Sequence, residues 1–409
     1  MKRARATTAP VTRRQAMAAA GGAAFLPLAV SPALGIQPSG AAEGKLRIEE
    51  LELTSVRVSE RTTWMFVHLR TNLGLAGLGE CSLGKRRELP ALGEAFEAVR
   101  GRSPFDIEAY RAAARERAAG GIFEATAFSA IEQALWDLVG RAVDAPVHAL
   151  TGGKLRDSLP AYANINRATR ERTPEGFAAN ARAAVEDGFT AIKAAPFDGF
   201  PALDAPASEV AAAADLGVAC VEAIREAVGA EIDILIDCHS FFDFELAVDV
   251  ARRLQPQRLA WYEEPVAPTD VAATKAIASG IEQRMAGGEF LFGIEGFGPL
   301  CREQAVDVIM PDVKHCGGLL EGRKIAAVAE LDGIAVSPHN PSGPVATAAS
   351  AQLCAGLPNF EILEMQWGEA AWRGDLVDPP ERFENGSIAA PDGPGLGVEL
   401  NDAVAQEHA

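Results

Sequence analysis

Three acidic residues at equal spacing are the first sign of chemistry in this sequence. Asp237, Glu263 and Glu289 lie 26 residues apart, and each ends an apolar run. Carboxylates that converge in a buried place repel one another unless a cation lies between them. An all-oxygen set suits Mg²⁺ better than Zn²⁺. Any one of them alone would more often be an acid in the first turn of a helix, but the three together favour a metal site.

Two histidines lie close to acids near the ends of these runs. His239 follows Asp237 by two residues, so both side chains point to the same side of a strand. It could transfer a proton or simply hold Asp237 in place. His339 lies in a Ser-Pro-His-Asn turn, and Asp312 ends the preceding apolar run. A lone histidine is usually a core residue, but that is less expected for one in such a turn with an acid on the neighbouring strand.

These residues belong to a region in which short β-rich runs alternate with Ala-rich amphipathic segments. The starts of the runs lie 22 to 43 residues apart, at 159–166, 189–196, 232–240, 259–265, 284–289, 306–313, 334–339 and 360–365. Eight strands at this spacing predict a (β/α) barrel, whose active site forms where the strands end. An open doubly wound sheet is disfavoured, because no glycine-rich phosphate turn follows the first strand.

The segment before the barrel has a different pattern. Residues 46–75 alternate apolar and polar side chains, which predicts an antiparallel meander with a turn near 59–62. From 89 to 150 apolar residues recur at three- and four-residue spacing, as in helices. Strands followed by helices predict a small α+β domain.

The first 42 residues look like an export signal. They hold Lys2, Arg3, Arg5, Arg13 and Arg14 and no acid, followed by an Ala- and Gly-rich apolar stretch at 16–30. The arginine pair resembles a twin-arginine signal, and the stretch is too short for a membrane anchor. We expect a periplasmic protein; a basic tail with an Ala-rich helix is the alternative.

Composition excludes several classes of protein. Of 409 residues, 38 are Lys or Arg and 56 Asp or Glu, giving a net charge of −18. An acidic chain without a basic run argues against nucleic-acid binding. Six cysteines without a CxxC pair argue against a disulfide framework or a zinc ribbon. We expect no membrane insertion, because no stretch of twenty apolar residues follows the leader.

Several motifs together resemble one family. They are Ala-Ile-Glu-Gln-Ala-Leu-Trp-Asp-Leu at 130–138, Leu-Thr-Gly-Gly at 150–153, Trp-Tyr-Glu-Glu-Pro at 261–265, and Asp312 followed by Cys-Gly-Gly at 316–318. This set resembles the mandelate racemase/muconate lactonizing enzyme branch of the enolase superfamily. The resemblance implies a (β/α)7β barrel with an N-terminal α+β capping domain and a C-terminal segment returning to the cap. The domains would then be a leader and linker at 1–42, the cap at 43–155, the barrel at 156–370 and the final segment at 371–409.

The resemblance also implies a cofactor and a type of reaction. Mg²⁺ would bind Asp237, Glu263 and Glu289 and hold a substrate carboxylate. Loss of the proton α to that carboxylate would give an enediolate that the metal stabilises. Members of the family commonly form homo-oligomers, and the same state is expected here.

Catalytic roles follow from the same resemblance. His339 with Asp312 matches the family's basic dyad. His239 matches the histidine that protonates the leaving β-hydroxyl in acid-sugar dehydratases. Glu364 matches an acid that hydrogen-bonds the substrate carboxylate; it would have to be protonated, so its pKa should be raised, unless it is merely a surface acid.

Other positions leave alternatives open. Lys193 matches the first lysine of the racemases' Lys-x-Lys motif, but Ala195 replaces the second, which disfavours a two-base racemase. Lys193 either contacts the substrate carboxylate or is a solvated strand-end lysine. Lys314 lies where cycloisomerases place a lysine. Asn164 and Trp64 are candidates for substrate contacts, although Trp64 could instead pack at the domain interface.

The leading hypothesis is a Mg²⁺-dependent dehydratase that converts a sugar acid to a 2-keto-3-deoxy acid. A racemase, epimerase or cycloisomerase of a carboxylate substrate is the second hypothesis. An exported carboxylate-binding protein without catalysis is the third, which an intact triad and dyad disfavour.

Overall fold

The computed structural model describes residues 45–83 and 87–409, so the predicted leader lies outside the described residues. The described chain begins with an antiparallel meander of β1 (Ile48–Arg57), β2 (Thr63–Thr71) and β3 (Ala76–Glu80). Helices α2 (Leu89–Glu97), α3 (Ile107–Ala118) and α4 (Ile122–Val143) follow. A Cβ on Gly79 of β3 would lie 2.3 Å from the carbonyl oxygen of Ala130, so glycine lets α4 pack directly on the strand.

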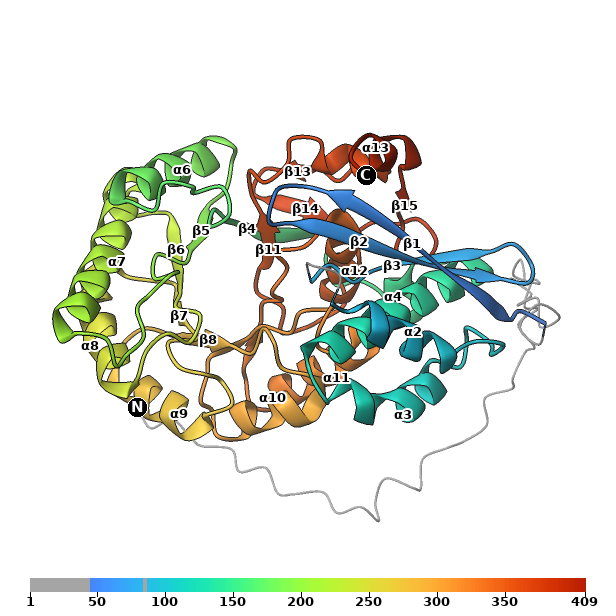
Figure 1. Cartoon of the computed structure of the whole chain (residues 1–409), viewed down its shortest axis with the longest axis horizontal. Helices are drawn as coiled ribbons and strands as arrows, with labels where there is room; N and C mark the ends of the chain where they lie inside the picture. The colour runs from blue at the N-terminus through green and yellow to red at the C-terminus, as the bar shows by residue number, and fades with distance from the viewer. Residues whose placement is uncertain (1–44, 84–86) are drawn as a thin grey trace, which may run out of the picture. The chain divides into compact units, whose positions relative to one another are not determined.

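Eight parallel strands then form the predicted barrel (Figure 1). They are β4 (Ser158–Asn164), β5 (Ala191–Ala194), β6 (Asp233–Asp237), β7 (Trp261–Glu263), β8 (Met285–Gly287), β9 (Val308–Ile309), β10 (Ala335–Val336) and β11 (Leu363–Gln366). Each overlaps one of the predicted runs. The ring closes because β11 pairs in parallel with β4, and Phe360 bridges to Val336 of β10.

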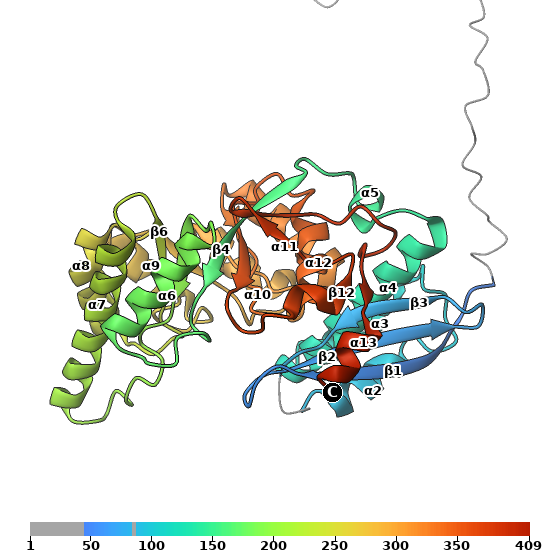
Figure 2. The ribbon, with the colours of Figure 1, turned by 90° about the horizontal axis from the view of Figure 1, so that it is seen from above.

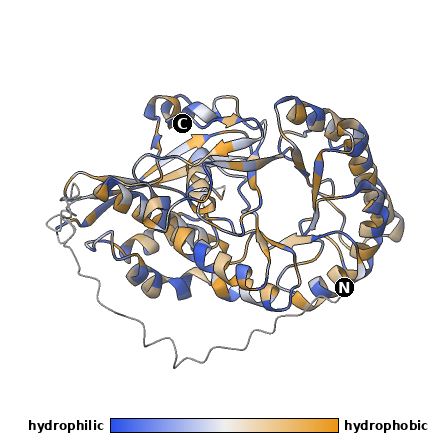
Figure 3. Cartoon of the chain, turned by 180° about the vertical axis from the view of Figure 1, so that it is seen from behind, coloured by the Kyte–Doolittle hydropathy of each residue, from blue (hydrophilic) through white to orange (hydrophobic). Residues whose placement is uncertain are grey.

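Seven helices connect consecutive strands, which confirms the predicted (β/α)7β arrangement. They are α6 (Pro174–Glu186), α7 (Ala207–Val228), α8 (Phe244–Leu254), α9 (Val271–Gly280), α10 (Gly293–Arg302), α11 (Gly318–Leu331) and α12 (Pro344–Cys354). Helix α8 is an example of how the sequence forms these helices. Asp243 caps it by accepting from the N–H of Leu246 at 2.9 Å, and most of its apolar residues are buried. Hydrophobic and hydrophilic residues alternate along the outer helices (Figure 3).

Helix α4 of the cap holds the turn that precedes α11 of the barrel. Glu132 accepts hydrogen bonds from the N–H groups of Leu319 and Leu320 at 2.7 and 2.9 Å. Ser129 accepts from the N–H of Gly317 at 3.0 Å. A Cβ on Gly318 would lie 1.9 Å from Glu132 Oε2, so this glycine leaves room for the carboxylate. Glu132, a polar residue of the 130–138 motif, therefore caps a helix of the barrel.

The last residues contact both the barrel and the cap. Strand β14 (Ser387–Ala389) pairs with β4, and helix α13 (Asp402–Glu407) ends beside β1, where the His408 carbonyl accepts from the N–H of Arg57 at 2.7 Å. Figure 2 shows α13 next to the cap strands. Among the described residues, none of the helices combines the length and the apolar character that crossing a membrane requires.

Candidate active site

A cavity of about 340 Å³ lies at the carboxyl ends of the barrel strands. Most of the predicted site residues line it: Trp64, Asn164, Lys193, Asp237, His239, Glu289, Lys314 and His339. Three others, Glu263, Asp312 and Glu364, are not in its lining and are fully buried. Residues at the carboxyl ends of strands between β4 and β11 thus line one cavity together with Trp64 of the cap, as predicted for a barrel of this type.

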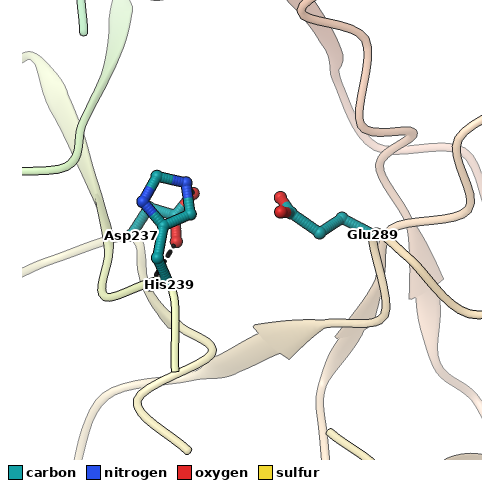
Figure 4. Close-up of side chains that lie close together, drawn as sticks. All are labelled: Asp237, His239 and Glu289. Carbon is teal, nitrogen blue, oxygen red and sulfur yellow. Dashed lines mark hydrogen bonds and ion pairs between the residues drawn. The ribbon is translucent and has the colours of Figure 1, made fainter. Parts of the chain in front are cut away.

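Asp237, His239 and Glu289 form the cluster best placed to hold a cation. One ligand atom from each lies within 4.8 Å of the others, and Figure 4 shows Glu289 pointing toward Asp237 and His239. Glu289 Oε2 is buried without a hydrogen-bond partner among the described residues. Burial and the charge of Asp237 raise the pKa of Glu289 well above its usual range. A divalent cation would relieve this repulsion and give the orphaned oxygen a partner, so these residues fit a metal.

Glu263 lies on the neighbouring strand with both oxygens engaged. Oε1 is bound by the Lys193 ammonium, and Oε2 accepts from the Trp261 indole at 3.0 Å. Lys193 Nζ also lies 3.1 Å from Asp237 Oδ2. Lys193 is 2% exposed, so the solvated strand-end alternative is wrong. Burial lowers its pKa, but the carboxylates of Glu263 and Glu364 outweigh that effect and raise the pKa well above normal.

His339 and Asp312 form the predicted pair. Nδ1 of His339 lies 2.8 Å from Asp312 Oδ2, and Nε2 lies 3.2 Å from Glu289 Oε2. Asp312 also accepts from the backbone N–H of Lys314 at 2.8 Å. Burial raises the pKa of Asp312, but the cationic side chain of Lys314 and the neighbouring imidazoles hold it well below the usual range. Nδ1 of His339 thus has a carboxylate partner, and Nε2 lies beside Glu289, which lines the cavity.

The expected raised pKa of Glu364 is wrong. Glu364 accepts from the N–H of Asn340 at 2.8 Å and from the amide of Asn164 at 2.5 Å, and Lys193 Nζ lies 3.8 Å away. Burial alone would raise its pKa, but Lys193 and these donors lower it. Glu364 is therefore an ionised, buried acceptor rather than a neutral donor or a surface acid. Asn164, a predicted substrate contact, is bound to it.

Two other predicted contacts lie at the cavity wall. Trp64 is 1% exposed and packs edge-on against Trp372, with ring centroids 5.7 Å apart. Most of its surface therefore contacts protein, as the packing alternative expected. Lys314 Nζ donates to the carbonyl of Ser82 at 3.3 Å, which ties the barrel rim to the loop after β3.

Sequence reasoning missed two acids near the cavity. Asp198, in the loop after β5, accepts from Nδ1 of His239 at 2.5 Å. Burial lowers the pKa of His239, but Asp237 and Asp198 outweigh it and raise the pKa to about 10. Glu369, after β11, accepts from Thr62 of the β1–β2 loop at 2.6 Å and pairs with Arg167 at 3.1 Å. Neither acid belongs to a recognisable motif, so no signal could have found them.

The chain is similar to known proteins in both of its domains. Residues 47–152 match the family described as mandelate racemase/muconate lactonizing enzyme, N-terminal domain, and residues 176–404 match the one described as enolase C-terminal domain-like. A solved structure of a mandelate racemase/muconate lactonizing enzyme from Jannaschia sp. CCS1 is 31% identical. It superposes with a TM-score of 0.80 over 88% of this chain and 97% of that chain.

Curated relatives add named activities. A D-gluconate dehydratase of Thermoproteus tenax is 36% identical over 84% of this chain and 69% of its own length. A D-xylonate dehydratase of Haloferax volcanii is 32% identical, over 88% of this chain and 90% of its own length. A D-galactarolactone cycloisomerase of Agrobacterium fabrum is 30% identical, over 85% and 92% respectively.

Proposed function

Because the chain belongs to the mandelate racemase/muconate lactonizing enzyme family of the enolase superfamily, we propose that it is a Mg²⁺-dependent sugar-acid dehydratase. Dehydratase relatives spanning most of the chain make it an enzyme, a carbon–oxygen lyase. One observation carries the mechanistic part of the proposal. His239 follows β6 and His339 follows β10, four strands apart in a ring of eight, so the two imidazoles enter the cavity from opposite sides.

His339 is the proposed base. Asp312 holds the proton on Nδ1, so Nε2 can accept a proton from the carbon α to the substrate carboxylate. Nε2 also lies close to Glu289 Oε2, at 3.2 Å, so a carboxylate bound beside Glu289 would place its α-carbon next to the base.

Asp237 and Glu289 would hold Mg²⁺, and Glu263 is the proposed third ligand. Mg²⁺ prefers oxygen donors to an imidazole nitrogen, which favours Glu263 over His239 as the third ligand. The ion would supply electrostatic stabilisation of the negative charge that develops on the substrate carboxylate. Lys193, between Asp237 and Glu263, adds a second positive charge at this end of the cavity.

His239 is the proposed acid. Its Nε2 lies 3.2 Å from Oδ2 of Asp237, and both residues line the cavity. Its φ of 45° and that of Ser240, 58°, are left-handed values that bulky residues rarely adopt, as is common at functional sites. Donation of a proton to the β-hydroxyl breaks the carbon–oxygen bond and releases water. The enol that remains becomes the 2-keto-3-deoxy acid.

Proton NMR in D₂O tests the proposal directly. The protein with Mg²⁺ would be incubated with aldonic, uronic and aldaric acids. We expect a 2-keto-3-deoxy acid from at least one of them. If none of the aldonic, uronic and aldaric acids loses water, the proposal of a sugar-acid dehydratase is contradicted.

A cycloisomerase is the second candidate, because Lys314 lines the same cavity and one relative is named a D-galactarolactone cycloisomerase. In the same experiment, deuterium uptake at the α-carbon without loss of water would favour this candidate or an epimerase.

We also propose export through the arginine pair of the leader. Cell fractionation of the full chain should find the protein in the periplasm, and replacing Arg13 and Arg14 with lysine should retain it in the cytoplasm. A periplasmic double variant would contradict the twin-arginine route.

A further inference from the structure

We propose that Asp198 is the positioning residue of His239 and sets the direction in which this imidazole presents its second nitrogen to the substrate. The inference rests on the proposed dehydration, in which His239 is the acid. Asp198 lies 41 residues before His239, in the irregular segment between β5 and α7.

The geometry around His239 repeats that of the base. Nδ1 of His239 is bound to Asp198 Oδ1 at 2.5 Å, and Nε2 lies 3.2 Å from Asp237 Oδ2. His339 has the same arrangement, with an aspartate on Nδ1 and a carboxylate of the cation cluster 3.2 Å from Nε2. Each ring is thus bound at Nδ1 by an acid, and its other nitrogen lies beside a carboxylate that lines the cavity.

Asp198 is itself held in place by two donors besides His239. The amide of Asn166 donates to Asp198 Oδ2 at 2.8 Å, and a guanidinium nitrogen of Arg172 lies 3.3 Å from the same oxygen. Both donors come from the segment between β4 and α6. The other oxygen, Oδ1, binds Nδ1 of the imidazole. Both oxygens of the carboxylate thus have partners, which fixes its orientation.

The loop that carries Asp198 is anchored by its neighbour. Phe197 is 2% exposed and packs against Phe242, with ring centroids 5.0 Å apart. A Cβ on Gly217 of α7 would lie 2.1 Å from the Phe197 ring, so only glycine leaves space for it there. A buried aromatic side chain therefore sets the position of the next residue along the chain.

The chemical need for such a residue comes from the imidazole itself. The ring must be protonated to act as the acid. Once it has given up one proton, the other proton could remain on either nitrogen, and a ring without a fixed partner can rotate. A carboxylate at Nδ1 keeps a proton there and fixes the ring plane. Nε2 is then the nitrogen that exchanges a proton with the leaving hydroxyl, whereas loss of Asp198 would leave Asp237 as the remaining carboxylate within reach.

The decisive variant is Asp198→Asn, with Asp204→Asn as the matched control. Asp204 lies on the same loop but is exposed. In D₂O with Mg²⁺ and the substrate found above, we expect Asp198→Asn to slow water loss about 10²-fold. Exchange of the α-proton should stay within about threefold of the parent, because His339 is untouched. The control should match the parent in both rates. An equal fall of both rates in Asp198→Asn, or no fall in either, would overturn the assignment.

A second measurement needs neither substrate nor metal. Protein labelled with ¹⁵N-histidine would be studied by NMR, with the His239 signals identified by their loss in His239→Gln. We expect a proton on Nδ1 with the downfield shift of a carboxylate hydrogen bond, changed in Asp198→Asn and unchanged in Asp204→Asn. An unaltered His239 spectrum in Asp198→Asn would refute the proposal. If the parent dehydrates no acid, the proposed function fails, while this spectrum still decides the role of Asp198.

Discussion

Nε2 of His339 lies 3.2 Å from Oε2 of Glu289, while Nδ1 of the same ring is bound to Asp312. The proposed base and a proposed metal ligand thus approach each other on neighbouring sides of one cavity. In a substrate, the α-carbon is bonded directly to the carboxylate carbon. If the carboxylate binds beside Glu289, the proton to be removed therefore lies near the imidazole. Proximity of this kind is a large part of catalysis.

Replacing His339 with Asn should abolish exchange of the α-proton and therefore water loss as well. The expected loss is about 10³-fold, because a positioned general base contributes ~10²–10⁴-fold. NMR in D₂O measures both rates. Asp312→Asn should also slow both, since Nδ1 then loses its ionised partner. A His339→Asn variant with full exchange would rule out this base.

Replacing His239 with Asn should have a different effect. We expect exchange of the α-proton to persist while formation of the keto acid stops, because the acid acts only on the leaving hydroxyl. The same two rates are compared with those of the parent. Equal loss of both would instead show that the imidazole supports Asp237, whose Oδ2 lies 3.2 Å from Nε2 of His239.

Metal affinity should separate the candidate ligands. Asp237→Asn and Glu289→Gln should weaken Mg²⁺ binding at least ~10–100-fold, the range that even outer partners of a metal cost. Glu263→Gln should weaken it similarly if Glu263 is the third ligand. Calorimetric titration with Mg²⁺ measures this, with the exposed Glu282→Gln as control. Parental affinity in Glu263→Gln would exclude Glu263 and favour His239, which belongs to the geometric cluster.

Glu132 should make stability depend on pH. Burial raises its pKa from 4.5 to about 7, although the hydrogen bonds from the N–H groups of Leu320 and Leu319 lower it. Between those two values the folded state keeps a proton that the unfolded chain has released. The free energy of unfolding should therefore fall as pH rises through this window, by about 3 kcal/mol in total.

Glu132→Gln removes that contribution. Its stability relative to the parent should improve as pH rises from 4.5 to 7, although it loses an acceptor for one backbone N–H of α11. Urea unfolding of both proteins across this range measures the difference. Parallel stability curves would contradict the raised pKa.

Glu369 should control how the β1–β2 loop covers the cavity. It accepts from Thr62 of that loop at 2.6 Å and pairs with Arg167 of the barrel. Glu369→Gln weakens a charged hydrogen bond, so we expect KM to rise about tenfold with a smaller change in kcat. Glu60→Gln, exposed on the same loop, is the control. An unchanged KM would show that this contact does not affect substrate binding.

The barrel was predictable because each strand is a short apolar run followed by an amphipathic helix, a pattern fixed by burial. Most site residues were predictable in position because they lie at or near the ends of barrel strands, while their roles came from the resemblance to a known family. Asp198 was not, because an irregular loop brings it to His239 across 41 residues. The pKa of Glu364 was not predictable either, because it depends on donors such as the backbone N–H of Asn340 that the sequence does not mark.

The contacts between α4 and the turn before α11 have a consequence for the evolution of the protein. The turn that begins at Asp312 and carries Lys314 is held by Ser129 and Glu132, and Thr126 contacts His315 at 2.9 Å. A barrel transplanted onto an unrelated first domain would lose these acceptors and with them the placement of Asp312. We therefore expect the two domains to be inherited as one unit.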